Sequence, residues 1–272
     1  MRVKTSRCNF RCIVPVDGLY HIFEEDLIDG HWRIFKRTSK DGTVFSERSG
    51  PLFPLGTPGA FDEWGQADPS VLIHGDQWMM WFDAMDKSYH WDRIGFAFSK
   101  DGDNWQILGT AIKRGPDDWD NKSVHHPVVI RDDKFYMYYS GCTYGEPHNV
   151  RHIGLAISED GHTWEKQGIV IEAGLPDEWD GEYVRSSSPV RIAGEWAMFY
   201  WGFNKVHGMG LATSPDLIHW QKRIQIESGT DSHNGITASW AISNGRQVRV
   251  WYTTFDDCEV FIKDFDIDKI HE

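Results

Sequence analysis

The sequence predicts an all-β protein, a five-bladed β-propeller that residues 1–272 form as one domain. A motif recurs about every 59 residues, strand-like segments fill the intervals, and no stretch has the pattern of a long amphipathic helix. The 272 residues divided by that period give about 4.6 units, each long enough for about four strands. Five blades around a central channel are therefore the expected architecture.

The recurring motif is Ser-x-Asp-Gly-x-x-Trp. Its copies are Ser99–Trp105 and Ser158–Trp164, with weaker copies at Ser39–Phe45 and Ser214–Trp220, and their aspartates are 60, 59 and 56 residues apart. Glycine supplies the positive φ of a tight turn, Ser and Asp satisfy backbone amides, and tryptophan packs between blades. We therefore interpret the motif as a structural turn between the third and fourth strands of each blade.

Two further series follow the same period. One consists of Asp68-Pro69, His126-Pro127 and Ser188-Pro189, and the other of the acidic segments Asp62–Trp64, Asp117–Asp120 and Asp177–Asp180. We interpret the acidic segments as latches that hold loops in place. The proline series marks the first strands of the blades, whose side chains line the channel of a propeller.

Short aromatic and β-branched segments bounded by turn residues are typical of strands. The first blade is degenerate, with strands expected at 12–16, 19–23 and 32–37. In the other four blades we expect strands at 70–73, 78–82 and 94–98; 128–130, 135–139 and 153–157; 190–192, 196–201 and 209–213; and 236–241, 247–253 and 259–265.

The charge balance argues against nucleic-acid and anionic-membrane partners. Lys and Arg number 28 against 41 Asp and Glu, a net charge of −13 with neutral histidines. The longest apolar stretch, Trp196–Phe203, is far shorter than the roughly 20 residues of a membrane helix. The first residues lack the apolar region of a signal peptide, so we expect a cytoplasmic protein. The four cysteines are expected to be reduced thiols rather than disulfides or zinc ligands: Cys8, Cys12, Cys142 and Cys258.

The face opposite the Asp-Gly turns is the candidate functional face. Its first-strand positions carry different polar residues in different blades, whereas residues that only pack would tend to repeat. The candidates there are Asp68, His125, His126, Ser188 and His233, and neighbouring segments add Trp91, Tyr144 and Arg185. Aromatic platforms beside hydrogen-bonding side chains suit a polar ring-shaped ligand such as a sugar.

Two segments of the second unit carry a family resemblance. Ala67-Asp-Pro-Ser-Val71, followed by Gly75-Asp-Gln-Trp-Met-Met-Trp81, resembles the first-blade signature of the five-bladed propeller glycosidases of the arabinanase, β-xylosidase and invertase types. The resemblance extends over roughly residues 60–225. It implies cleavage of a glycosidic bond by carboxyl groups, one of which protonates the leaving oxygen. Asp68 matches the aspartate of the family's Asp-Pro motif.

The later first strands depart from the family pattern. His125-His126-Pro127 and Ser187-Ser188-Pro189 stand where further carboxylates would begin, and the acid nearest to Ser188 is Glu182. We expect Asp68 to position water and Glu182 or a channel histidine, His126, to act as the acid. Strand alternation would turn only one of the two adjacent histidines inward. Glu24 and Asp83, at the ends of second strands, could also turn inward.

The remaining candidates are assigned to the substrate. We expect His125, Arg185, Ser188, Trp91, Tyr144 and His233 to contact a small carbohydrate or glycoside. No cofactor is expected, and no His-x-x-x-His spacing indicates a metal site, although Asp68 could supply oxygen to a channel calcium or sodium ion.

Three alternatives to hydrolysis stay open. In a phosphorylase, phosphate would replace water and be held by Arg185, Arg151 and the histidines. The absence of the second and third carboxylates instead favours a non-catalytic sugar-binding propeller. A histidine base could also serve elimination or isomerisation. The sugar, its linkage and the oligomeric state stay open at this point.

Overall fold

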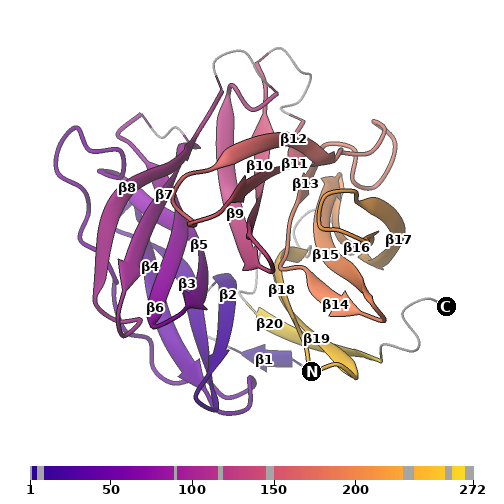
Figure 1. The fold of residues 1–272 in the computed structure, drawn as a ribbon, viewed down its shortest axis with the longest axis horizontal. Coiled ribbons are helices and arrows are strands. Elements are labelled where there is room, and N and C mark those ends of the chain that lie inside the picture. The colour runs from indigo at the N-terminus through magenta and orange to yellow at the C-terminus, as the bar shows by residue number, and fades with distance from the viewer. Residues whose placement is uncertain are drawn as a thin grey trace.

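The computed structural model is a five-bladed β-propeller, as predicted (Figure 1). It describes residues 2–4, 9–88, 91–115, 119–144, 150–228, 236–254 and 259–266. Five antiparallel sheets are arranged around a common centre, and within these residues there is no helix with the length and apolar character needed to cross a membrane.

Each blade follows the chain outward from a first strand next to the channel. The strands, blade by blade, are β2 (Asn9–Val16), β3 (Leu19–Ile28) and β4 (His31–Ser39); β5 (Gly65–His74), β6 (Gln77–Met85), β7 (Trp91–Ser99) and β8 (Trp105–Lys113); β9 (Ser123–Arg131), β10 (Phe135–Cys142), β11 (His152–Ser158) and β12 (Glu165–Ile171); β13 (Tyr183–Arg185), β14 (Val190–Ile192), β15 (Glu195–Asn204), β16 (Val206–Ser214) and β17 (Gln221–Ser228); and β18 (Ile236–Ser243), β19 (Gln247–Thr254), β20 (Glu259–Asp266) and β1 (Arg2–Lys4).

Five strands lie outside the ranges expected from the sequence: the fourth strands β8, β12 and β17, which agree with the expectation of about four strands a blade, and the short strands β1 and β13. β1 pairs with β20 and so closes the ring by completing the last blade with the N-terminal segment. The first strand of blade 4 is interrupted. β13 is its N-terminal half and β14 its C-terminal half, and both halves pair with β15. Both β1 and β13 are three residues long, too short to carry an alternation pattern. Blade 1 is degenerate as predicted, because its sheet has three strands and only one bridge, Lys36 to Ser49, on its outer edge.

The Ser-x-Asp-Gly turns join third and fourth strands and are structural, as predicted. In the turn that follows β7, Oδ1 of Asp101 accepts hydrogen bonds from the backbone amides of Asp103 and Asn104. The turns also tie neighbouring blades together, since a second-strand side chain donates to the turn of the next blade. The donors and acceptors are Trp251 Nε1 to Gly42 O, Trp81 Nε1 to Gly161 O, both 2.9 Å, and Tyr138 Oη to Leu217 O, 2.7 Å.

The acidic segments act as latches, which confirms the second structural interpretation. The buried carboxylate of Asp120 accepts from the Tyr139 hydroxyl at 3.0 Å and pairs with Lys166 at 2.6 Å. Asp180 in the next blade repeats both contacts with Tyr200 and Lys222. These recurring contacts hold the loops of blades 3 and 4 in place. The polar first-strand positions, which differ from blade to blade, are the ones that remain as candidates for a functional site.

Candidate functional site

A cluster of polar side chains, all buried except the half-buried His126, lies where the first strands of blades 2, 3 and 4 meet. Its members are Asp68 on β5, His125 and His126 on β9, and Arg185 on β13, joined by Glu25 from β3 and Asp83 from β6. Four of the six were predicted as site residues, Asp68, His125 and His126 on their first-strand position and Arg185 from a neighbouring segment. Asp83 turns inward as proposed for it.

Asp68 is the centre of the cluster and is only 5% exposed. One carboxylate oxygen accepts a hydrogen bond from Nη2 of Arg185, and the other lies 3.5 Å from Nε2 of His126. The three residues come from three different blades, so the closed ring of the propeller brings them together. The guanidinium balances the carboxylate charge that would otherwise be isolated in the protein.

Two members of the cluster have left-handed backbone. The φ of Asp68 is 47° and that of His126 is 56°, and each lies at a break in the register of its strand. Non-glycine residues in this region are uncommon, and they concentrate at functional sites. The bend changes the alternation of β9, so the rings of His125 and His126 come together with centroids 4.1 Å apart. The expectation that only one histidine would turn inward is therefore wrong.

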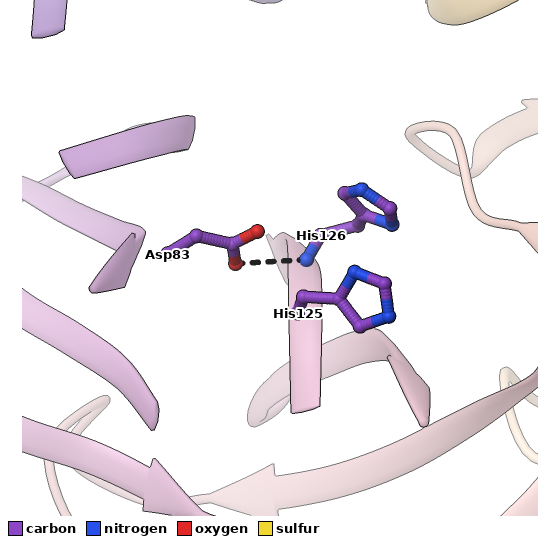
Figure 2. Close-up of side chains that lie close together, drawn as sticks. All are labelled: Asp83, His125 and His126. Carbon is purple, nitrogen blue, oxygen red and sulfur yellow. Dashed lines mark hydrogen bonds between the residues drawn. The ribbon is translucent and has the colours of Figure 1, made fainter. Parts of the chain in front are cut away.

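Each bend is held by a carboxylate from the preceding blade. The amide of Asp68 donates to Oε2 of Glu25 at 2.5 Å, and the amide of His126 donates to Oδ1 of Asp83 at 2.8 Å. Figure 2 shows the second of these contacts, with the Asp83 carboxyl facing the backbone of β9. The sequence indicated Glu24 rather than Glu25 for the inward position. Glu24 instead pairs with Arg37 at 3.0 Å, so this expectation is wrong.

Burial shifts the titration of two groups in the cluster. The pKa of Asp83 is raised well above its usual value by burial, with the charge of Asp68 adding to the effect and that of Arg185 opposing it. The pKa of His125 is lowered well below its usual value, first by burial and then by His126 and Arg151. These shifts favour a protonated Asp83 and a neutral His125 near neutral pH.

Arg151 adds a second guanidinium near the histidines. Its backbone bridges to blade 4, since its amide donates to Glu182 O and its carbonyl accepts from the Val184 amide, both at 3.1 Å. The guanidinium carbon lies 5.3 Å from the centre of the Tyr183 ring. The buried Nε has no hydrogen-bond partner among the described residues. Arg151 and Arg185 therefore place two positive charges around the histidine pair, an arrangement that suits an anion.

Other predicted residues lie outside this cluster. The backbone of Glu182 bonds to Phe203 and Arg151. Among the described residues, the Asp68 side chain contacts Arg185 and His126, and Glu182 is not one of these two partners. The Ser188 hydroxyl donates to Ala241 O at 2.8 Å and accepts from the Ala241 amide at 3.0 Å, and so links blades 4 and 5.

Three predicted substrate contacts remain. Tyr144 is 61% exposed, and its hydroxyl accepts a hydrogen bond from Arg114 at 3.3 Å. Trp91 begins β7, and its side chain lies outside the described part of the chain, as does the whole of His233.

The structure brings in Glu25, which sequence reasoning missed. The strand pattern does not single it out. Glu24 pairs with Phe10 and Asp83 pairs with Ala67, in each case next to the break in the first strand. An alignment of the second strands of blades 1 and 2 therefore places Glu24, and not Glu25, opposite Asp83.

Three side chains of the cluster offer ligand atoms close to one another. Asp83, His125 and His126 each offer one such atom, and these atoms lie within 4.8 Å of one another. One oxygen of Asp83 already accepts the His126 amide, as Figure 2 shows. We derive no metal chemistry from this group, because it supplies three protein ligands whereas a closed structural zinc site uses four.

A hollow is lined by the other halves of the first strands. It has a volume of about 710 Å³ and is lined mainly by aliphatic side chains, among them Val14, Leu72, Val129 and Ile242. Such a surface lacks the convergent polar groups that fix a sugar. The polar cluster around Asp68 is therefore the candidate site.

The fold and a site centred on a buried carboxylate define a five-bladed propeller of the glycoside-processing class, which confirms the predicted resemblance. The family model described as β-1,4-mannooligosaccharide phosphorylase (Glyco_hydro_130) matches residues 68–234. The chain belongs to this family. The matched segment begins at Asp68 and includes His125, His126, Arg151 and Arg185.

Two relatives match this chain at similar identity over different lengths. The uncharacterized protein MT1551 of Mycobacterium tuberculosis (strain CDC 1551 / Oshkosh) is 28% identical over 192 residues, which cover 66% of this chain and 62% of that protein. The 1,2-β-oligomannan phosphorylase of Thermoanaerobacter sp. (strain X514) is 27% identical over 129 residues, 47% of this chain and 40% of that one. In both cases the chain spans less than two thirds of the relative.

Solved structures share the whole architecture. The β-1,2-mannobiose phosphorylase from Listeria innocua, in complex with β-1,2-mannobiose, superposes with a TM-score of 0.74 at 16% identity, over 99% of this chain and 91% of that one. A thermostable family-43 glycoside hydrolase also gives 0.74 at 16% identity, over 97% and 91%. Since a phosphorylase and a hydrolase match equally well, the fold leaves the reaction to be argued from the site.

Proposed function

We propose that the protein is a glycoside phosphorylase that cleaves β-linked mannooligosaccharides with inorganic phosphate. The observation that carries the proposal is the ion pair of one central carboxylate, Asp68, with Arg185, together with a second guanidinium, that of Arg151, whose charge acts on the neighbouring His125. An attacking phosphate needs positive charge around it, whereas an attacking water needs a second carboxylate as base. The family model and the names of the two phosphorylase relatives support a β-mannoside substrate.

The other carboxylates of the cluster are poorly placed to act as that base. Glu25 and Asp83 already accept the backbone amides of Asp68 and His126. The pKa of Asp83 is raised by burial, which favours its protonated form, and a protonated carboxyl cannot take a proton from water. Hydrolysis by the two-carboxyl mechanism therefore lacks a free partner for Asp68 within this cluster.

In the proposed reaction Asp68 supplies the proton and phosphate supplies the nucleophile. A phosphate oxygen bonds to the anomeric carbon while the bond from that carbon to the glycosidic oxygen breaks. The departing oxygen takes the Asp68 proton, directly or through a sugar hydroxyl, and Asp68 regains a proton from the solvent. The products are a glycosyl phosphate and a shortened sugar, with inversion at the anomeric carbon because the nucleophile enters opposite the leaving oxygen.

Arg185 has two roles in this scheme. In this structure its guanidinium is paired with Asp68, which favours the ionised carboxylate. When phosphate binds, the same guanidinium can turn its remaining N–H groups to the phosphate oxygens. That shift withdraws positive charge from Asp68 and favours its protonated form, the form that can act as an acid. The neutral His125 and its neighbour His126 can donate further hydrogen bonds to the phosphate.

The test is chain shortening of β-1,4- and β-1,2-linked mannooligosaccharides with and without inorganic phosphate. We expect turnover only with phosphate, and a loss of about 100-fold or more in Asp68→Asn, as for removal of a general acid. Glu182→Gln is the matched control, and we expect it to keep most of the activity.

Turnover without phosphate would overturn the proposal in favour of a hydrolase. Sugar binding without turnover on any linkage, undisturbed in Asp68→Asn, would overturn it in favour of a binding propeller. A large loss in Glu182→Gln with activity kept in Asp68→Asn would move the acid to the loop before β13.

A further inference from the structure

The same device occurs at two successive steps of the propeller. A second-strand carboxylate accepts the backbone amide of a bent first-strand residue in the next blade. Glu25 does this for Asp68, and Asp83 does it for His126. The two carboxylates are 2% and 1% exposed, so neither contact is a surface hydrogen bond.

The bent residues need such support. Left-handed backbone at a non-glycine residue persists only when the surrounding structure holds it. At His126 the bend decides where the ring lies, since it brings Nε2 to 3.5 Å from Oδ2 of Asp68. Loss of the amide acceptor would therefore be felt at the ring of His126 and at its contact with Asp68.

Asp83 also faces the central carboxylate itself. Its second oxygen, Oδ2, is buried and has no hydrogen-bond partner among the described residues, and the charged groups around Asp83 are Asp68, Glu25 and Arg185. Two adjacent carboxyls cannot readily both stay ionised in a buried site, so one of them is expected to keep a proton. Arg185 is paired with Asp68, which leaves Asp83 as the protonated member.

We propose that Asp83 is a positioning residue of this site: one of its oxygens fixes the bend that directs His126 toward Asp68, and the other, when protonated, donates a hydrogen bond to Asp68. Asp83 thereby couples the orientation of the histidine to the hydrogen bonding of the central carboxylate. It does not touch the reacting atoms, and its effect passes through its two partners. The kinetic consequence rests on the proposed phosphorolysis, whereas the structural consequence does not.

The test compares Asp83→Asn with Asp83→Ala. Asparagine keeps an oxygen for the His126 amide and offers an N–H₂ donor to Asp68, so it reproduces both contacts of a protonated carboxyl. Alanine removes both. Asp180→Asn, at a buried latch in blade 4, is the control for general loss of packing.

The first readout is hydrogen exchange and ring titration of His126 by NMR in the full chain. We expect Asp83→Ala to speed exchange of the His126 amide at least about tenfold and to change the ring titration, and we expect Asp83→Asn to restore both. Asp180→Asn should leave both signals as in the unmodified protein. Unchanged exchange and titration in Asp83→Ala would overturn the proposal, whether or not any substrate is found.

The second readout is the kinetics with phosphate. We expect Asp83→Ala to lower kcat about 10- to 100-fold with a smaller change in KM, and Asp83→Asn to recover most of that loss. If asparagine is as damaging as alanine while restoring the NMR signals, the carboxyl itself acts in the chemistry and positioning is the wrong description. If no variant or parent protein turns over substrate, the proposed function fails and the NMR readout still decides the role of Asp83.

Discussion

The aspartates of the turns and those of the channel show the same side chain in opposite environments. Asp101 lies in an exposed turn, where backbone and side-chain donors surround its carboxylate and lower its pKa. Asp83 lies in the channel cluster, where burial and the charge of Asp68 raise its pKa. The turn aspartate recurs in four blades, whereas among the described residues the contact that Asp83 makes is repeated by Glu25 alone. The repeated positions therefore form the scaffold, and the positions that break the repeat form the site.

The largest expected effect is on the channel side. Arg185→Ala leaves the buried Asp68 carboxylate without its guanidinium, and we expect unfolding to become easier by about 3 kcal/mol at neutral pH. The half-saturating phosphate concentration should also rise. Chemical denaturation and phosphate titration measure the two effects.

A double variant provides the check on that interpretation. If the cost comes from the uncompensated charge, then Asp68→Asn combined with Arg185→Ala should recover a large part of the stability. No recovery would mean that Arg185 stabilises the fold through packing rather than through its charge.

The next effect belongs to the scaffold. Gly42 has a φ of 74°, and an added Cβ would meet the Trp251 ring at 2.9 Å. We expect Gly42→Ala to cost about 2 kcal/mol from backbone strain and the contact with the ring. Gly18→Ala is the matched control, because its φ is 73° and nothing lies within 4 Å of the new Cβ, so only the backbone strain of about 1 kcal/mol remains.

Thermal unfolding of both glycine variants measures this difference. Equal losses would contradict the packing contribution. Neither substitution should alter phosphate dependence, since neither residue lies near the channel cluster. A change in phosphate dependence would show that scaffold and site are not separable.

The smallest effects should have opposite signs in the two environments. Asp83 has a raised folded pKa, so it reduces stability as pH rises from the unfolded value of 3.8 toward the folded one. Asp83→Asn should therefore gain melting temperature relative to the parent protein across that range. Asp101 has a lowered folded pKa, so it contributes stability above 3.8 that is lost as pH falls below that value. Asp101→Asn should therefore lose melting temperature relative to the parent above 3.8.

Melting curves at several pH values for the two variants and the parent measure these two opposite changes in melting temperature. Parallel curves for all three proteins would mean that the two aspartates titrate alike. In that case the contrast between turn and channel would not hold.

The predictability of each part follows from how local its determinants are. The turn motif, its period and the strand segments are local patterns, and they predicted five blades and the structural role of the Asp-Gly turns. The strand β1 could not be predicted in the same way, because its place is set by closure of the ring with β20.

The candidate site was predictable where it depends on position in the repeat. Asp68, His126 and Arg185 were each named from their place near the first strands, and the structure brings the three together. The choice between Glu24 and Glu25 depends on how β3 meets the bend of the next blade. The approach of the His125 ring to the His126 ring depends on the left-handed φ of His126. Both are tertiary features that strand alternation alone does not contain.

The most direct test of phosphorolysis is ³¹P NMR of a reaction of the protein with a β-linked mannooligosaccharide and inorganic phosphate. The account predicts that the phosphate signal declines while an α-configured mannose 1-phosphate appears, and that Asp68→Asn abolishes the change. Release of free mannose with an unchanged phosphate signal would contradict it, because water and not phosphate would then be the nucleophile.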